Sequence, residues 1–242
     1  MLAYHGIGDV PLRVDRHGLF VRPQELSRQV RKLRAWGYEL LSFGQLARRL
    51  SEDGGEGAAA LTFDDGLAGN LETLDSLGVP ATLFVVSGWL GGEHPDVPSA
   101  RILTTSELRR LAEHGLEIGS HTRTHPDLTQ LEDDAVRGEL VGSKHDLEEL
   151  LQRAVEVASY PYGLAGEATV RACSEAGYRA ACASTGNGSW DDPHNLPRQD
   201  MNRGSTMLAL RLKRDGLYEP LVRRLPGRAL RALTRRIQLR LE

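Results

Sequence analysis

Two adjacent carboxylates, Asp64 and Asp65, directly follow an apolar run at residues 58–63 (AAALTF). The run has the length and composition of a buried strand. An unpaired charge buried in a protein costs several kcal/mol. At the carboxyl end of a strand, however, the pair would face a loop-lined cleft in which a bound cation can offset its charge. The pattern therefore predicts a metal site at this point of the chain.

A second motif supplies the other ligands that such a site needs. His121 and His125 belong to the segment SHTRTH, which follows a predicted strand at residues 116–121. Two imidazoles and one carboxylate are a common ligand set for zinc and other divalent ions. Each motif alone is weak, because histidines four residues apart are mostly helix-surface neighbours and an aspartate pair is mostly a cap or a solvated turn. Together, each at the end of a predicted strand, they favour a metal site.

Short apolar segments alternate with longer amphipathic ones along most of the chain. The apolar segments predict strands within residues 1–5, 38–43, 58–63, 79–86, 116–121, 155–163 and 178–184. Helices are predicted near residues 23–37, 44–50, 67–78, 105–115 and 132–152 and before Gly177, with Thr105 or Ser106 as the cap of the fourth. This alternation predicts an α/β fold whose parallel sheet closes, or nearly closes, into a barrel. In such barrels the chemistry lies at the carboxyl ends of the strands.

Composition narrows the class of protein. The chain has 40% hydrophobic and 26% charged residues, which is typical of a globular protein. It contains no apolar run of about 18 residues and no signal-peptide pattern at its start. We therefore expect a cytoplasmic location, unless a start further upstream encodes an export signal. Cys173 and Cys182 are expected to be reduced, structural thiols.

Three motifs, TFDDG (62–66), SHTRTH (120–125) and YPYG (160–163), resemble in type and order those of the polysaccharide deacetylase family. This family is also called NodB-homology or carbohydrate esterase family 4, and the resemblance spans about residues 1–200. The YPYG form and the Pro197-Arg198 pair resemble the poly-N-acetylglucosamine deacetylase branch more than the chitin deacetylase branch. The resemblance implies a distorted (β/α)7 barrel, similar to a TIM barrel, that removes acetyl groups from N-acetylated sugars with a divalent metal.

The resemblance also implies roles for individual residues. Asp65, His121 and His125 would bind one divalent metal ion, zinc in the first place, although the ligand set also suits cobalt, nickel or iron. Asp64 would be the general base that takes a proton from the attacking water. The backbone N–H of Tyr162 would stabilise the oxyanion of the tetrahedral intermediate.

Two departures from the family pattern affect these roles. In the family, an arginine usually orients the base aspartate, and a histidine in a later motif usually protonates the leaving amine. Here Ser159 stands in place of the arginine, and the stretch that ends in Arg198 lacks the histidine. Our hypothesis is that Arg198 orients Asp64 from a different loop. His5 and His194 are the candidates for the general acid, and a packing role for His5 is an equal alternative.

Two loops carry weaker signals. Trp190 could stack on a sugar face, or it could only anchor its loop, and Asp191 or Asp192 could shape the pocket. Residues 93–101 resemble an insertion that could cover the cleft. Two other functions stay open: hydrolysis of a non-sugar amide on the same scaffold, and a catalytically silent protein that binds carbohydrate or acts as a scaffold.

The C-terminal segment differs in charge from the rest of the chain. Residues 208–242 contain ten basic and three acidic residues, whereas residues 1–207 contain twenty and thirty. We predict a deacetylase domain at residues 1–207 and a basic amphipathic helical extension at 208–242. The extension either packs on the acidic domain or makes peripheral contact with anionic lipid. An N-acetylated carbohydrate is the expected partner, and nucleic acid is not expected.

Overall fold

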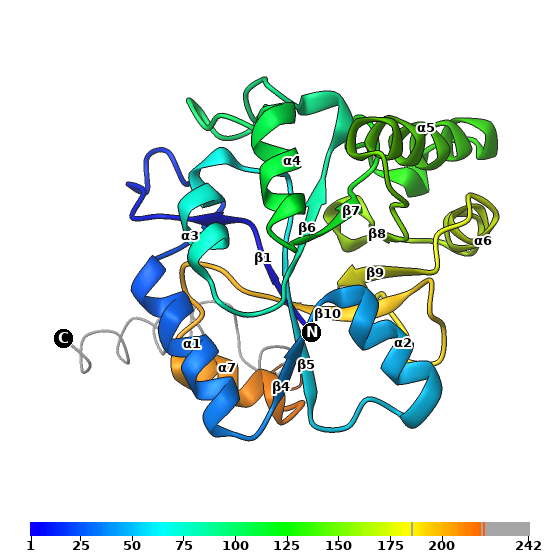
Figure 1. Cartoon of the computed structure of the whole chain (residues 1–242). Helices are drawn as coiled ribbons and strands as arrows, with labels where there is room; N and C mark the ends of the chain where they lie inside the picture. The colour runs from blue at the N-terminus through cyan, green and yellow to red at the C-terminus, as the bar shows by residue number, and fades with distance from the viewer. Residues whose placement is uncertain (185, 219, 221–242) are drawn as a thin grey trace.

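The computed structural model describes residues 1–184, 186–218 and 220. Seven parallel strands run in the order β1-β10-β9-β8-β7-β6-β5, and β5 pairs back with β1, which closes a barrel (Figure 1). Their bounds are β1 Leu2–Tyr4, β5 Ala58–Phe63, β6 Thr82–Val85, β7 Glu117–Ser120, β8 Val157–Ser159, β9 Ala180–Ser184 and β10 Leu196–Asp200. The predicted (β/α)7 barrel is therefore confirmed.

The barrel is distorted where β5 meets two strands along one edge. Residues 58–60 of β5 pair with β4 (Glu39–Leu41), and residues 61–63 pair with β1. A separate pair of short strands, β2 (Gly6–Ile7) and β3 (Phe20–Val21), flanks the barrel. The barrel therefore closes through only the second half of β5, which is the half that leads into Asp64 and Asp65.

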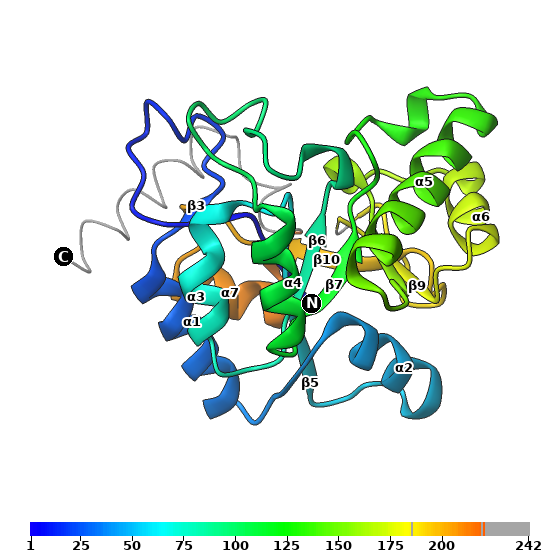
Figure 2. The same ribbon diagram turned by 45° about the horizontal axis from the view of Figure 1, so that its top comes forward.

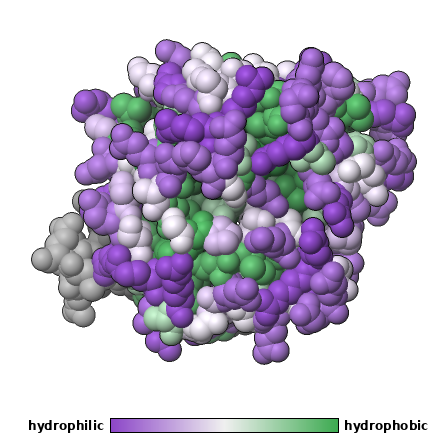
Figure 3. All heavy atoms as spheres, viewed as in Figure 1, coloured by the Kyte–Doolittle hydropathy of each residue, from purple (hydrophilic) through white to green (hydrophobic). Residues whose placement is uncertain are grey.

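Helices surround the barrel (Figure 1). The α-helices are α1 Pro23–Ala35, α2 Phe43–Asp53, α3 Leu71–Ser76, α4 Thr105–Glu113, α5 Asp133–Leu151, α6 Glu167–Glu175 and α7 Met207–Arg214. Short 3₁₀ turns lie at Ala68–Asn70, Ser87–Trp89, Leu128–Gln130 and Pro161–Gly163. Hydrophilic side chains cover most of the outer helices, and hydrophobic ones show mainly in the seams between them (Figure 3).

The structure corrects several local predictions. The strand predicted at residues 155–163 ends at Ser159, and residues 161–163 form a 3₁₀ turn. Helix α4 is capped by Thr104, whose hydroxyl accepts a hydrogen bond from the Glu107 amide, rather than by Thr105 or Ser106. Strand β10 was not predicted, because Pro197 inside it argues against a strand. The apolar character of the other strands follows from the barrel, since parallel strands covered by helices are buried on both faces.

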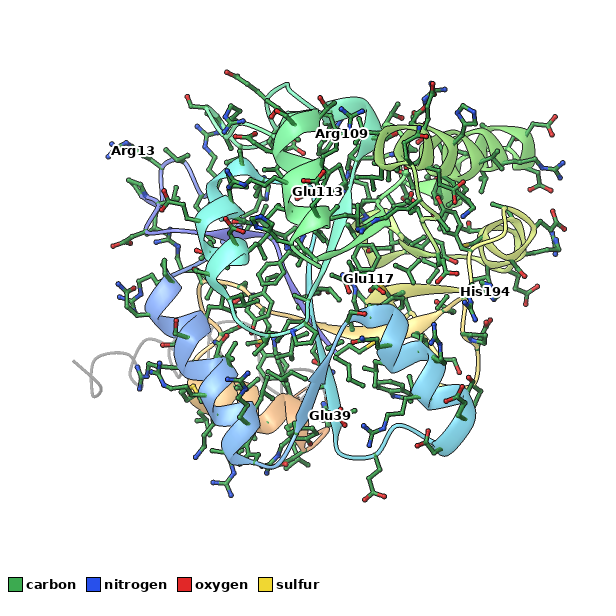
Figure 4. The ribbon with its side chains drawn as sticks, in the orientation of Figure 1. Arg13, Glu39, Arg109, Glu113, Glu117 and His194 are labelled. Atoms are coloured by element: carbon green, nitrogen blue, oxygen red, sulfur yellow. The ribbon has the colours of Figure 1, made fainter. Side chains whose placement is uncertain are left out.

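Glu117 joins the start of β7 to the first turn of α2, at the end of the barrel opposite the strands' carboxyl ends (Figure 4). Its carboxylate accepts hydrogen bonds from the Ser42 hydroxyl, the Gly44 amide and the Thr82 hydroxyl at 2.6–2.9 Å. We expect Glu117→Ala to lower the free energy of unfolding by about 2–3 kcal/mol, because three donors lose a charged partner. Urea denaturation would measure this. The control Glu113→Ala, at an exposed site on α4, should stay within about 0.5 kcal/mol of the parent, and an equal effect of both variants would contradict the prediction.

The C-terminal extension is only partly described. Helix α7 begins at Met207, so it crosses the predicted boundary at residues 207 and 208, and its Ala209 and Leu210 are buried. The rest of the predicted amphipathic extension, at residues 221–242, lies outside the described residues. The extension, its lipid contact and the cytoplasmic location stay predictions. Among the described helices, none is long and apolar enough to cross a membrane.

Both cysteines lie in the core. Cys173 and Cys182 are fully buried, and burial raises the pKa of each thiol to about 12. A thiol with so high a pKa is a poor nucleophile at neutral pH. This agrees with a structural role for the two residues.

Candidate metal centre and active site

A cavity of about 370 Å³ opens at the carboxyl ends of the barrel strands. The loops that follow β2 and β6 rise at this end of the molecule (Figure 2). Because all barrel strands are parallel, motifs that follow different strands converge here. The polar residues around the cavity include His5, Asp64, Asp65, His94, His121, His125, Tyr162 and Arg198.

Left-handed backbone geometry turns the motifs toward the cavity. The Asp64 amide still bonds to the Tyr4 carbonyl at 2.8 Å and extends the β1–β5 ladder, but Asp65 has a φ of 71°. Thr122, His125 and Tyr162 also have positive φ values, between 58° and 66°. Each such residue costs about 1–3 kcal/mol and persists where the surrounding structure enforces it, as is common at functional sites.

Asp65, His121 and His125 form a candidate metal site. The Asp65 Oδ1 atom lies 3.7 Å from the Nε2 atoms of both histidines, and the three ligand atoms lie within 4.8 Å of one another. This oxygen is buried and accepts no hydrogen bond from any residue that the structure describes. A buried oxygen without a donor is costly. A divalent cation between the three atoms would satisfy it, so the donor set fits a metal.

The two imidazoles are prepared to act as ligands. His121 Nδ1 donates a hydrogen bond to the Ser159 carbonyl at 2.8 Å, so the Nε2 lone pair of the neutral ring faces Asp65. Burial, together with the neighbouring His121, lowers the pKa of His125 to about 4. His125 is therefore neutral at pH 7, as metal binding requires. Its ring packs against those of His121 and Tyr162, with centroids 4.9 Å apart in both cases.

Arg198 and Asp64 form a buried, bidentate ion pair. The two guanidinium nitrogens donate to the two oxygens of Asp64 at 2.8 and 2.7 Å, and both residues are 3% exposed. Burial alone would raise the pKa of Asp64. The charge of Arg198 and its hydrogen bonds outweigh burial and hold that pKa below its ordinary value. Asp64 is therefore a carboxylate at neutral pH, and it lies 3.9 Å from His121 Nε2.

Ser159 takes part in the same contact. Its hydroxyl accepts a hydrogen bond from Arg198 at 2.5 Å, and the Thr62 hydroxyl accepts a second at 2.8 Å. The small serine on β8 thus leaves room for a guanidinium that comes from β10. The structure places Arg198 in contact with Asp64, as the sequence hypothesis required, but from strand β10 and not from a loop.

Similarity to known proteins identifies the family of this chain. The sequence profile of the family described as "Polysaccharide deacetylase" matches residues 51–181 of the chain. The chain belongs to the polysaccharide deacetylase family. The resemblance seen in the sequence is thereby confirmed at the level of the family, while the branch within it stays a prediction.

Individual members of the family are similar over much of the chain. YxkH of Bacillus subtilis is 28% identical over 185 residues, which are 74% of this chain and 62% of YxkH. A chitooligosaccharide deacetylase of Bradyrhizobium is 26% identical over 64% of this chain and 68% of its own length. The structure of deacetylase PplD from Streptococcus pyogenes, a complex with acetate, superposes with a TM-score of 0.74 at 25% identity, and covers 86% of this chain and 94% of PplD.

Two residues with expected catalytic roles, His5 and Tyr162, border the cavity of this polysaccharide deacetylase. His5 follows β1 and is partly exposed, and its carbonyl accepts a hydrogen bond from the side-chain Nδ2 of Asn70 at 2.6 Å. Tyr162 follows Pro161 in the left-handed region with a φ of 58°, and its side chain is exposed. Both residues are therefore within the region where a substrate would bind.

His194 does not belong to the site of this family member, and its candidacy as general acid is wrong. It lies two residues before β10 begins, whereas the cavity lies at the other end of the strands. Its Nε2 atom is 2.9 Å from the Tyr178 carbonyl, and the residue sits on the outer flank of the barrel (Figure 4). The reason is topological: the chain must return to the amino end of the barrel before it can start another parallel strand.

The same loop carries Trp190, Asp191 and Asp192, and none of them lines the cavity. Trp190 is 56% exposed, and Asp192 accepts a hydrogen bond from the amide of His194 within its own loop. The aspartates therefore do not shape the described cavity, and stacking of Trp190 on a sugar finds no support there.

His94 is the residue that sequence reasoning missed. It belongs to the segment 93–101, for which the sequence indicated only an insertion that could cover the cleft. In the structure its side chain is buried, and its Nε2 atom lies 3.3 Å from Asp65 Oδ2. A single histidine in a loop rich in glycine and proline gives no sequence signal, because only the path of the loop brings it to Asp65.

Proposed function

We propose that this chain is a metal-dependent hydrolase that removes the N-acetyl group from an amino sugar. One observation carries the proposal: a buried carboxylate, Asp64, held by Arg198, lies next to a three-residue ligand set whose Asp65 oxygen lacks a hydrogen-bond donor among the described residues. Asp65, His121 and His125 would hold the cation. When bound, a divalent cation supplies Lewis-acid chemistry, which polarises a carbonyl and makes a water more acidic.

The chain's own residues provide the remaining steps. Asp64 accepts a proton from the attacking water, while Arg198 fixes both of its oxygens. The Tyr162 amide donates to the oxyanion that forms from the acetyl carbonyl, a contribution of about 3–4 kcal/mol for one such donor. His5 then protonates the departing sugar nitrogen, and acetate and the free amine leave.

The relatives support an N-acetylated sugar as the substrate class. One is named a chitooligosaccharide deacetylase, and another, PplD, was solved with acetate bound. The chain spans 62% of the length of YxkH, so the activity of a whole relative comes to it only as a proposal. Zinc is the first choice of metal, and cobalt, nickel and iron suit the same donor set.

Release of acetate tests the proposal. The purified chain, loaded with zinc or cobalt, should release acetate from N-acetylglucosamine oligomers, lose this activity on chelation and regain it when metal is restored. Asp64→Asn should retain the metal but not the activity. Bound metal without acetate release from a broad panel of N-acetyl sugars would favour the catalytically silent, carbohydrate-binding alternative. Hydrolysis of non-sugar amides alone would favour the alternative in which the scaffold hydrolyses a non-sugar amide.

Replacement of His5 tests its proposed role as general acid. We expect His5→Gln to slow acetate release from an N-acetyl sugar by about 10²- to 10⁴-fold, because the amine then leaves without a proton donor. Hydrolysis of 4-nitrophenyl acetate, whose leaving group needs no proton, should change much less. Steady-state kinetics on both substrates would measure the difference. Equal losses on both would show that His5 only supports packing.

A further inference from the structure

The loop between β6 and α4 is fastened to the loop that carries the aspartates. The Leu103 amide bonds to the Gly66 carbonyl at 2.9 Å, directly after Asp65. Within the loop, the His94 amide bonds to the Ala100 carbonyl at 2.8 Å and the Ile102 amide to the Gly92 carbonyl at 2.9 Å. These bonds hold His94 in register with Asp65.

Both nitrogens of the His94 ring are engaged. Nδ1 accepts a hydrogen bond from the Asp96 amide at 3.1 Å, so the hydrogen of the neutral ring lies on Nε2 and points to Asp65 Oδ2, 3.3 Å away. The Trp89 ring packs against His94 edge-on, with centroids 5.1 Å apart, and the His94 side chain is 5% exposed. The ring is therefore fixed in both tautomer and orientation.

The two oxygens of Asp65 consequently have different surroundings. Oδ2 accepts the hydrogen bond from His94, whereas Oδ1 faces His121 and His125 and has no donor among the described residues. A carboxylate free to rotate could offer either oxygen, or both, to a cation. The contact with His94 removes that freedom.

We propose that His94 is a positioning residue that makes Asp65 a ligand through Oδ1 alone. The inference rests on the metal site of the proposed function, and it adds a residue that the family motifs in this chain do not contain. His94 acts through Asp65, since neither of its nitrogens is free to bind the cation or to reach the substrate. Loss of such a hydrogen bond to a ligand typically weakens metal affinity 10- to 100-fold.

Metal affinity of three variants tests the inference. His94→Phe keeps the ring that packs on Trp89 but has no donor, and His94→Gln keeps an N–H near the position of Nε2. We expect the dissociation constant for zinc, from chelator competition, to rise 10- to 100-fold in His94→Phe and less than about fivefold in His94→Gln. His145→Phe, at a side chain 75% exposed on α5, should leave it unchanged.

Three results would overturn the inference. Unchanged affinity in His94→Phe, with metal bound by the parent, would reduce His94 to packing. An equal loss in His94→Gln would show that the N–H donor is not what matters. Three histidine rings with paramagnetically shifted ligand signals in the NMR spectrum of the cobalt-loaded parent, in place of two, would make His94 a ligand. If the parent chain itself binds no metal, the proposed function fails instead, and the two failures are thereby distinguished.

Discussion

Replacing both His121 and His125 with alanine is expected to abolish metal binding and acetate release together. The parent should bind about one divalent ion per chain, and the double variant almost none, because a single carboxylate, Asp65, is left of the three ligands. Lewis-acid stabilisation is worth several kcal/mol, so acetate release should fall about a thousandfold or more. Elemental mass spectrometry and an acetate assay would measure the two quantities.

The double variant should remain folded, which separates loss of metal from loss of structure. Its circular dichroism should match that of the metal-free parent, while its free energy of unfolding should fall by about 1–3 kcal/mol, because the buried Ser159 carbonyl loses the hydrogen bond from His121. A variant that folds and still holds one metal ion would refute the site. A parent that holds no ion after incubation with zinc or cobalt would refute the hydrolytic mechanism itself.

Removal of Arg198 is expected to have the second large effect, on stability as well as activity. Arg198→Met leaves Asp64 as an unpaired charge that is 3% exposed. Breaking a buried ion pair in this way typically lowers the free energy of unfolding by 3–5 kcal/mol. Urea denaturation of the metal-free protein would measure the loss. The control Arg179→Met, which breaks a surface pair with Glu156, should cost less than about 1 kcal/mol.

A second substitution shows whether the loss comes from the stranded charge. Asp64→Asn combined with Arg198→Met removes both charges, so it should recover at least half of the lost stability. It should not recover acetate release, because the proposed base is gone. If the double variant is as unstable as Arg198→Met, the loss comes from packing around the guanidinium and not from the ion pair.

The sequence by itself determined the elements and the two strongest motifs. A strand or a helix can be recognised from the spacing of apolar residues along the chain. The alternation of predicted strands and helices therefore indicated the barrel. Parallel strands end on one side, so the aspartates after β5 and the histidines after β7 were expected to meet, and the structure does bring Asp65, His121 and His125 together. Arg198 was proposed by a different route, from the family resemblance, because Ser159 stands where the family usually has an arginine.

Only the tertiary structure decided how the loops reach the site. His194 and His94 both lie in loops with no periodic pattern, yet the first turns back to the amino end of the barrel and the second folds over Asp65. Strand β10 was also evident only from the structure, because Pro197 inside it argues against a strand in the sequence. The structure alone likewise shows that His94 bonds to one oxygen of Asp65, while the other has no donor among the described residues. Local sequence fixes local geometry, but a contact between distant segments depends on the whole path of the chain between them.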